Sequence, residues 1–67
     1  MENKYLVRAI DTDGNISFYN GKAGSAWITP IRQEAFGYDS REAAQRKAKL
    51  FNEMTPVHGL RFIAILD

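Results

Sequence analysis

Two apolar segments, residues 4–10 (KYLVRAI) and 16–19 (ISFY), are separated only by the turn sequence DTDGN. Asp13 and Gly14 both tolerate the positive φ of a type I′ turn, so this arrangement predicts a β-hairpin. Residues 4–10 carry apolar side chains on both alternating faces, which is typical of a strand that is covered on both sides. The start of the chain is therefore expected to form the centre of a sheet.

Residues 38–54 (YDSREAAQRKAKLFNEM) predict the one long helix. Asp39 or Ser40 can act as its N-cap, and with Asp39 in that role Glu42 has the spacing of a capping box. At about 100° per residue, one face of this helix is apolar, and its members are Ala43, Ala44, Ala48, Leu50, Phe51 and Met54. Lys47 projects from the same face, so we expect its aliphatic stem to pack and its amine to reach solvent.

The remaining segments predict two more strands. Residues 26–29 (AWIT) form a short third strand that ends at Pro30, and residues 60–66 (LRFIAIL) form the last. Residues 31–36 either extend the third strand past a bulge or form an irregular edge. The fold class is α+β, with the order β-β-β-α-β in a single domain of residues 1–67. A small antiparallel or mixed sheet of three to four strands has one helix packed on one face. The second face needs another cover, either the segment 22–36 or a second copy of the chain.

The stretch NGKAGSAW (residues 20–27) contains Gly21 and Lys22, which are residue types of a phosphate-binding loop. Such a loop has another glycine five positions before the Gly-Lys pair and a Ser or Thr directly after it. Here Gly14 is seven positions away and Ala23 follows the lysine. We therefore expect a surface linker between strands and no bound nucleotide.

Metal and enzyme chemistry have little support in the sequence. The chain has no cysteine and a single histidine, His58, so a metal site is not expected. A chain of 67 residues leaves little room for an enclosed pocket of about 300 Å³ or more. We expect no enzyme, no catalytic residues and no cofactor. No apolar run reaches the roughly 18 residues of a membrane span and no signal peptide is evident, so a soluble cytoplasmic protein is expected.

The chain has more large apolar side chains than one short helix can cover. Aromatic residues left at a surface are favoured anchors of protein interfaces. The predicted partner-binding residues are Tyr19, Trp27, Phe36 and Tyr38. They could instead complete a small core, and that alternative stays open at this point. A protein partner is expected, and a homodimer is compatible with the same surplus.

The alternative function is single-stranded nucleic-acid binding. Arg8 and Arg61 are lone cations in otherwise apolar strands, and Tyr5 and Phe62 lie close to them in sequence. Cations beside aromatic side chains on a sheet can hold a single strand by stacking. The formal net charge of only +1 weighs against this alternative.

The layout of the whole chain also resembles a group of known sequences. The features are KYLVRAI before Asp13-Gly14, then ISFYNG, AWITP and EAFGYDSREAAQRKAKLFN before the last strand. In this order they resemble the short uncharacterised accessory proteins of phages and prophages of low-GC Gram-positive bacteria. Three details depart from that pattern. Ile28 separates Trp27 from Thr29, Ala35 directly precedes Phe36 where the pattern has Ala-x-x-Phe, and Ser40-Arg41-Glu42-Ala43 is one residue shorter than the pattern's Ser-x-x-Glu-Ala. The resemblance implies an accessory protein of a mobile element that binds and modulates a host protein, and it implies no catalytic residue.

Overall fold

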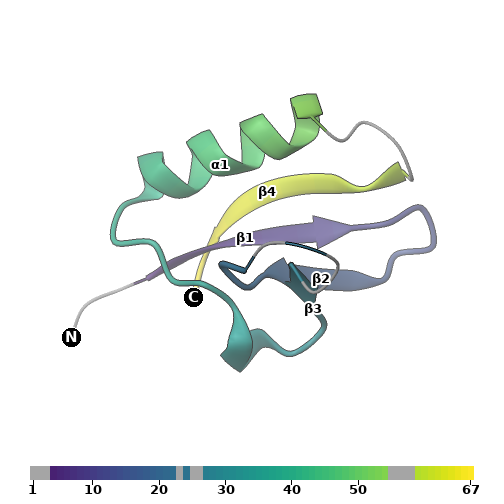
Figure 1. Ribbon diagram of the computed structural model, residues 1–67, viewed down its shortest axis with the longest axis horizontal. Coiled ribbons are helices and arrows are strands. Elements are labelled where there is room, and N and C mark those ends of the chain that lie inside the picture. The colour runs from purple at the N-terminus through teal and green to yellow at the C-terminus, as the bar shows by residue number, and fades with distance from the viewer. Residues whose placement is uncertain (1–3, 23, 25–26, 55–58) are drawn as a thin grey trace.

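The computed structural model describes residues 4–22, 24, 27–54 and 59–67. Over these residues, four antiparallel strands form one sheet in the order β3-β2-β1-β4, with one α-helix packed on it (Figure 1). The elements are β1 (Tyr5–Ile10), β2 (Ile16–Tyr19), β3 (Ile28–Thr29), the 3-10 helix η2 (Arg32–Glu34), α1 (Arg41–Met54) and β4 (Arg61–Leu66). The predicted α+β fold, with its helix between the third and fourth strands, is confirmed.

The predicted hairpin joins β1 and β2, with a different turn from the one expected. The Asp11 N–H donates to the Asn15 carbonyl at 3.1 Å, and the Gly14 N–H donates to the Asp11 carbonyl at 3.1 Å. Gly14 has a φ of +88°. These features indicate a three-residue loop of residues 12–14, which ends in a glycine with positive φ, instead of a two-residue type I′ turn. The side chain of Asp11 explains the difference, because its carboxylate accepts hydrogen bonds from backbone N–H groups of this turn.

The Asp11 carboxylate accepts three hydrogen bonds within this loop. Its Oδ1 accepts from the backbone N–H groups of Asp13 and Asn15, both at 2.9 Å, and its Oδ2 accepts from Asn15 Nδ2 at 3.1 Å. The backbone N–H of Asn15 is the main cause that lowers the pKa of Asp11 below its ordinary value of 3.8. A carboxylate whose pKa is lowered in the folded state stabilises the fold at pH values above its ordinary pKa.

We therefore expect the free energy of unfolding to fall as the pH is lowered past 3.8 and towards the lowered pKa of Asp11. Below that value both the folded and the unfolded chain bind the proton, and the stabilisation is gone. Urea unfolding between neutral pH and pH values below 3.8 measures this dependence. The Asp11→Asn variant should show a flatter profile, and Asp13→Asn is the control from the same turn. Equal profiles for the two variants would contradict this assignment.

The N-cap of α1 lies one position later in the chain than the predicted capping box requires. The Ser40 Oγ accepts a hydrogen bond from the Ala43 N–H at 3.1 Å, so Ser40 is the N-cap. Asp39 instead pairs with Lys4, which precedes β1. The hydrogen bond from Lys4, followed by its charge, lowers the pKa of Asp39. The alternative of Asp39 as N-cap is wrong because a residue distant in sequence engages its carboxylate.

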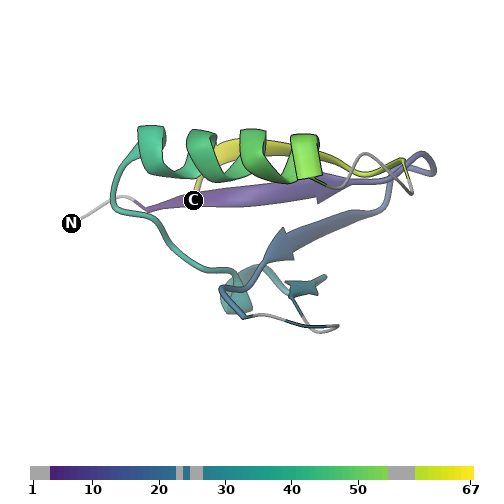
Figure 2. The ribbon, with the colours of Figure 1, turned by 45° about the horizontal axis from the view of Figure 1, so that its top comes forward.

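The core lies between α1 and the β1–β4 pair, along which the helix runs on one side (Figure 2). Its fully buried members are Val7, Ala9, Ala44, Ala48 and Phe62. The two alanines allow the helix backbone to approach the sheet closely. The expected apolar helix face is too wide, because its outer members, Leu50 and Met54, are exposed.

The segment between β2 and α1 differs most from expectation. β3 is limited to Ile28–Thr29, and Ala26 lies outside the described residues. Residues 31–36 do not extend β3, because they contain the 3-10 helix η2. The chain then returns to the sheet, where Tyr38 and Tyr5 exchange backbone hydrogen bonds at 2.8 and 2.9 Å. This return brings the segment after η2 next to the start of β1.

The second face of the sheet is only partly covered, and the segment 30–37 provides that cover. Leu6 and Phe18 are buried on this face, and the Arg32 guanidinium lies 5.8 Å from the centre of the Phe18 ring. Ile16 and Ile63, further along the same face, remain exposed. The expectation that the segment after β2 covers this face is therefore met at one end of it and fails at the other.

Candidate protein-binding surface

The four aromatic residues predicted to bind a partner form one continuous group of rings. The Tyr19 ring centre lies 6.5 Å from that of Trp27 and 6.3 Å from that of Phe36. Phe36 and Tyr38 meet edge to face at 4.8 Å. The helix adds Phe51, whose ring lies 4.9 Å from Tyr19 and 5.1 Å from Trp27. We call these five residues the aromatic surface.

Backbone contacts of Tyr19, the last residue of β2, and of Asn20, which follows it, hold the aromatic surface together. The Tyr19 carbonyl accepts a hydrogen bond from the Phe36 N–H at 2.8 Å. The Asn20 N–H donates to the Trp27 carbonyl at 3.0 Å. Gly21 has a φ of +83°, and a Cβ placed on it would lie 2.6 Å from Cδ1 of Phe36. A glycine is therefore required here both for the turn and for the position of the Phe36 ring.

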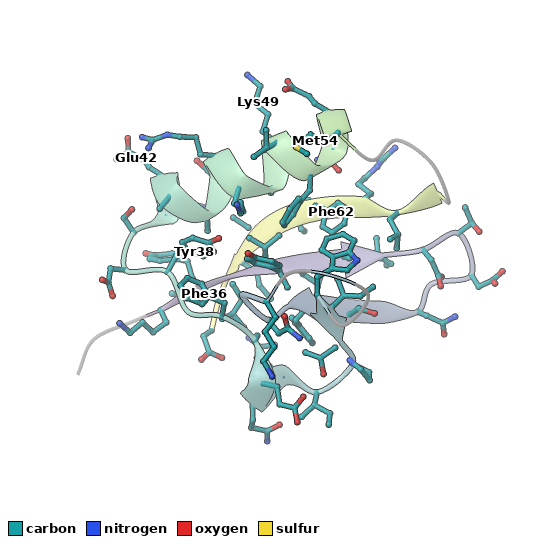
Figure 3. The ribbon with its side chains drawn as sticks, viewed as in Figure 1. Phe36, Tyr38, Glu42, Lys49, Met54 and Phe62 are labelled. Atoms are coloured by element: carbon teal, nitrogen blue, oxygen red, sulfur yellow. The ribbon has the colours of Figure 1, made fainter. Side chains whose placement is uncertain are left out.

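A hollow of about 330 Å³ lies beside these rings. Its walls include Tyr19, Trp27, Phe51, Lys22 and Met54. This volume is at the lower end of the range for small-molecule pockets, about 300–1,000 Å³, and it suits one or two apolar side chains of a partner. Figure 3 shows Phe36 and Tyr38 near the start of α1 and Met54 at its other end, so the surface extends along the helix.

The aromatic surface contributes both to the core and to the exterior. Trp27 packs against the buried Phe62, with ring centres 5.6 Å apart. Tyr19, Trp27, Tyr38 and Phe51 are all half-buried. Phe36 is 44% exposed and Met54 is 66% exposed, so these two give a partner apolar area that the fold does not use. Trp27 and its half-buried neighbours therefore help to complete the core, whereas most of the Phe36 ring stays outside it.

The charge on this surface is positive. Lys47 is half-buried, and its Nζ lies 5.3 Å from the centre of the Phe51 ring and 5.7 Å from that of Tyr19. The stem packs as expected, but the amine lies over aromatic faces, in the range of a cation–π interaction. Burial, followed by the neighbouring Tyr19, raises the pKa of Tyr38 above 10.0. The Tyr38 phenol is therefore neutral at physiological pH and adds no negative charge.

Sequence reasoning missed Phe51 in the aromatic surface and Met54 at the hollow beside it. Phe51 and Met54 were expected in the core, because a helical period shows which side chains share a face but not how far the sheet extends beneath them. Lys47 did give a signal, since it stands four positions before Phe51 on the same helix face. No feature of the sequence predicted that the chain turns back after η2 and places Phe36 next to Tyr19.

The residues of the nucleic-acid alternative do not form one surface. Tyr5 and Phe62 lie on the face that α1 covers, and Phe62 is 1% exposed. Arg8 and Arg61 lie on the opposite face. Side chains alternate between the two faces of a strand, so these cations and rings point in opposite directions. A stacking platform made of all four is therefore not present in the described structure.

The described residues also bear on metal binding and on membrane crossing. The described residues contain no cluster of three or more acidic or histidine side chains that could hold a metal ion, and His58 lies outside them. Within the same part of the chain, no helix is both long and apolar enough to cross a membrane. Comparison of the sequence and structure with protein-family models, curated proteins and solved structures finds no match.

Proposed function

We propose that this chain is a small non-enzymatic interaction module that binds and modulates another protein through its aromatic surface. The observation that supports this function is the continuous group of rings beside an open hollow, with Phe36 and Met54 exposed at its border. The resemblance to accessory proteins of phages and prophages supports a host protein as the partner. The cytoplasm is the corresponding location.

The proposed mechanism is occlusion of a site on the partner. An apolar side chain of the partner enters the hollow between Trp27 and Met54, and the exposed ring of Phe36 covers the adjacent surface. Strand addition at a sheet edge, the other way to bind a partner, has less support. β3 has only two residues, and on β4 the Asn52 side chain already bonds both backbone groups of Phe62.

The Phe36→Ala variant tests this function. We expect it to weaken partner binding by about tenfold or more, because truncating an aromatic hot-spot residue of an interface costs about 2 kcal/mol or more. The partner is first captured from nuclease-treated lysate of the bacterial host and identified by mass spectrometry, and its affinity is then measured by calorimetry. Trp27→Ala is a poorer choice, because Trp27 also supports the core through Phe62.

Ile31→Ala is the matched control, since Ile31 is 47% exposed and lies outside the aromatic surface. Equal affinities of the Phe36 and Ile31 variants would remove the aromatic surface from the binding site. If binding disappears with nuclease and falls steeply with salt, the chain binds nucleic acid instead.

A further inference from the structure

The sheet face opposite α1 has an unusual centre. Arg8 stands in the middle of β1 on this face, and its cross-strand neighbours are Phe18 on β2 and Ile63 on β4. Most of the next positions on the same face are aliphatic, at Leu6, Ile10, Ile16 and Ile65, and the exception is Arg61. We call the part of this face formed by Arg8, Ile10, Ile16, Ile63 and Ile65 the open face.

The charge of Arg8 has no counterpart among the described residues. Its Nε is covered from solvent and has no hydrogen-bond partner there. Arg32, which also borders this face, is in contrast paired with Asp67 at 3.0 Å. A buried nitrogen of this kind costs free energy until a partner satisfies the group.

Acidic side chains of the neighbouring segments are engaged elsewhere. Glu34 accepts a hydrogen bond from the Thr29 hydroxyl at 3.0 Å. Asp67 pairs with Arg32, and Asp11 holds the hairpin turn. These carboxylates neutralise or cap other sites, and among the described residues none of them pairs with Arg8.

We propose that the open face docks a segment of another protein in which one carboxylate stands between aliphatic side chains. The carboxylate pairs with the Arg8 guanidinium, and the aliphatic groups cover Ile16 and Ile63, which are 45% and 40% exposed. Arg61, exposed on the same face, adds positive charge that attracts an acidic segment. This surface is separate from the aromatic surface, since the two lie on opposite sides of the sheet.

Two other occupants fit this face less well. A single-stranded nucleic acid needs exposed rings for base stacking, but Phe18 on this face is only 6% exposed. A second copy that packed face to face would bring Arg8 and Arg61 against the same residues of its partner, because a twofold contact uses one patch on both subunits. Like charges in such a contact repel each other. An acidic and aliphatic segment satisfies both the charge and the apolar area.

Selection of random short displayed peptides against the full chain tests the proposal. We expect the selected peptides to share one Asp or Glu next to aliphatic residues. Arg8→Gln should weaken their binding by about 30-fold, because truncating one member of a desolvated charge pair costs 2–5 kcal/mol or more. Arg46→Gln, an exposed arginine of α1, is the matched control. Neither this control nor Phe36→Ala should change the affinity, which separates this surface from the aromatic surface.

A second measurement is independent of any peptide. Arg8→Met should raise the thermal midpoint of the free protein by about 4–8 °C, because it removes an unpaired buried nitrogen worth roughly 1 kcal/mol. The proposal is overturned if no acidic peptide is selected, or if Arg8→Gln and Arg46→Gln bind equally well. It is also overturned if the face binds oligothymidylate in an Arg8-dependent way, or if Ile63→Asp dissociates a dimer.

Discussion

The Phe62→Ala variant is expected to lower the free energy of unfolding by about 3–5 kcal/mol, the range for truncating a large buried aromatic residue. Phe62 is 1% exposed and belongs to the core cluster between the sheet and α1. Its ring lies 5.1 Å from that of Phe51 and 5.6 Å from that of Trp27, so the truncation leaves a cavity under two further rings. A domain of this size has little stability to spare, and the variant should be close to unfolding.

Urea or thermal unfolding followed by circular dichroism measures this loss. Ile63→Ala is the matched control, since Ile63 is the next residue on the same strand but is 40% exposed and lies on the other face. The control should lose much less stability. Similar losses for the two variants would mean that the face covered by α1 is not the main core.

The Phe62→Ala variant should also disturb the aromatic surface, because Phe62 in the core supports one of its rings. Trp27 is not in a strand, and its indole rests on Phe62 and Phe51. Loss of Phe62 therefore removes the support for the ring that lines the hollow. Reduced partner binding by a Phe62 variant would report a disturbed surface, whereas reduced binding by Phe36→Ala reports a lost contact.

Much of the fold could be predicted because the relevant signals are local. β2 has the predicted bounds, and β1 and β4 each begin one residue after the predicted start. Alternating apolar residues and the Asp13-Gly14 turn explain these strands. The helix could be predicted from its composition. The width of its buried face could not be predicted, because that width depends on how far the sheet extends beneath the helix.

The region after β2 could not be predicted because long-range contacts determine it. Lys4 engages Asp39, and Tyr5 pairs with Tyr38 through the backbone, across about half of the chain. Arg32 likewise reaches Asp67 at the C-terminal end of β4. No propensity of these residues encodes such partners, so the sequence left residues 31–36 open between strand and irregular edge.

The sequence was enough to select four aromatic residues as candidates for the site, but it did not predict how these residues are arranged. The chemistry of Tyr19, Trp27, Phe36 and Tyr38 was visible in the sequence, whereas their meeting point depends on the return of the chain to β1. The alternation of β1 did contain one further signal. Tyr5 and Arg8 differ by an odd number of positions, which places them on opposite faces of a strand.

The two faces of the sheet offer different chemistry to partners. On the side of α1, rings and a hollow suit an apolar side chain, and Lys47 lies over two of the rings. On the other side, Arg8, whose Nε has no hydrogen-bond partner among the described residues, stands between isoleucines, and we propose that it pairs with a carboxylate. Under the two proposals, one small domain contacts two proteins, or two parts of one protein, through opposite faces of its sheet.

The Asn52→Ala variant is expected to lower the free energy of unfolding by about 2 kcal/mol, because two hydrogen bonds of roughly 1 kcal/mol each are lost. The Asn52 amide bonds both backbone groups of Phe62, with Oδ1 accepting from the N–H at 2.8 Å and Nδ2 donating to the carbonyl at 2.9 Å. β4 is an edge strand, so these groups have no strand partner on that side. The helix therefore closes the edge of the sheet with one side chain.

Denaturant unfolding and sedimentation velocity together measure the two consequences of this change. We expect Asn52→Ala to be less stable and also more prone to self-association, because a free strand edge is a template for pairing with another chain. Asn52→Asp can accept from the Phe62 N–H but cannot donate to its carbonyl when ionised, so it should fall between the wild type and Asn52→Ala. Gln45→Ala, an exposed position on α1, is the control. If Asn52→Ala behaves like Gln45→Ala in both measurements, the edge of β4 is not protected by this amide, and strand addition becomes the better account of partner binding.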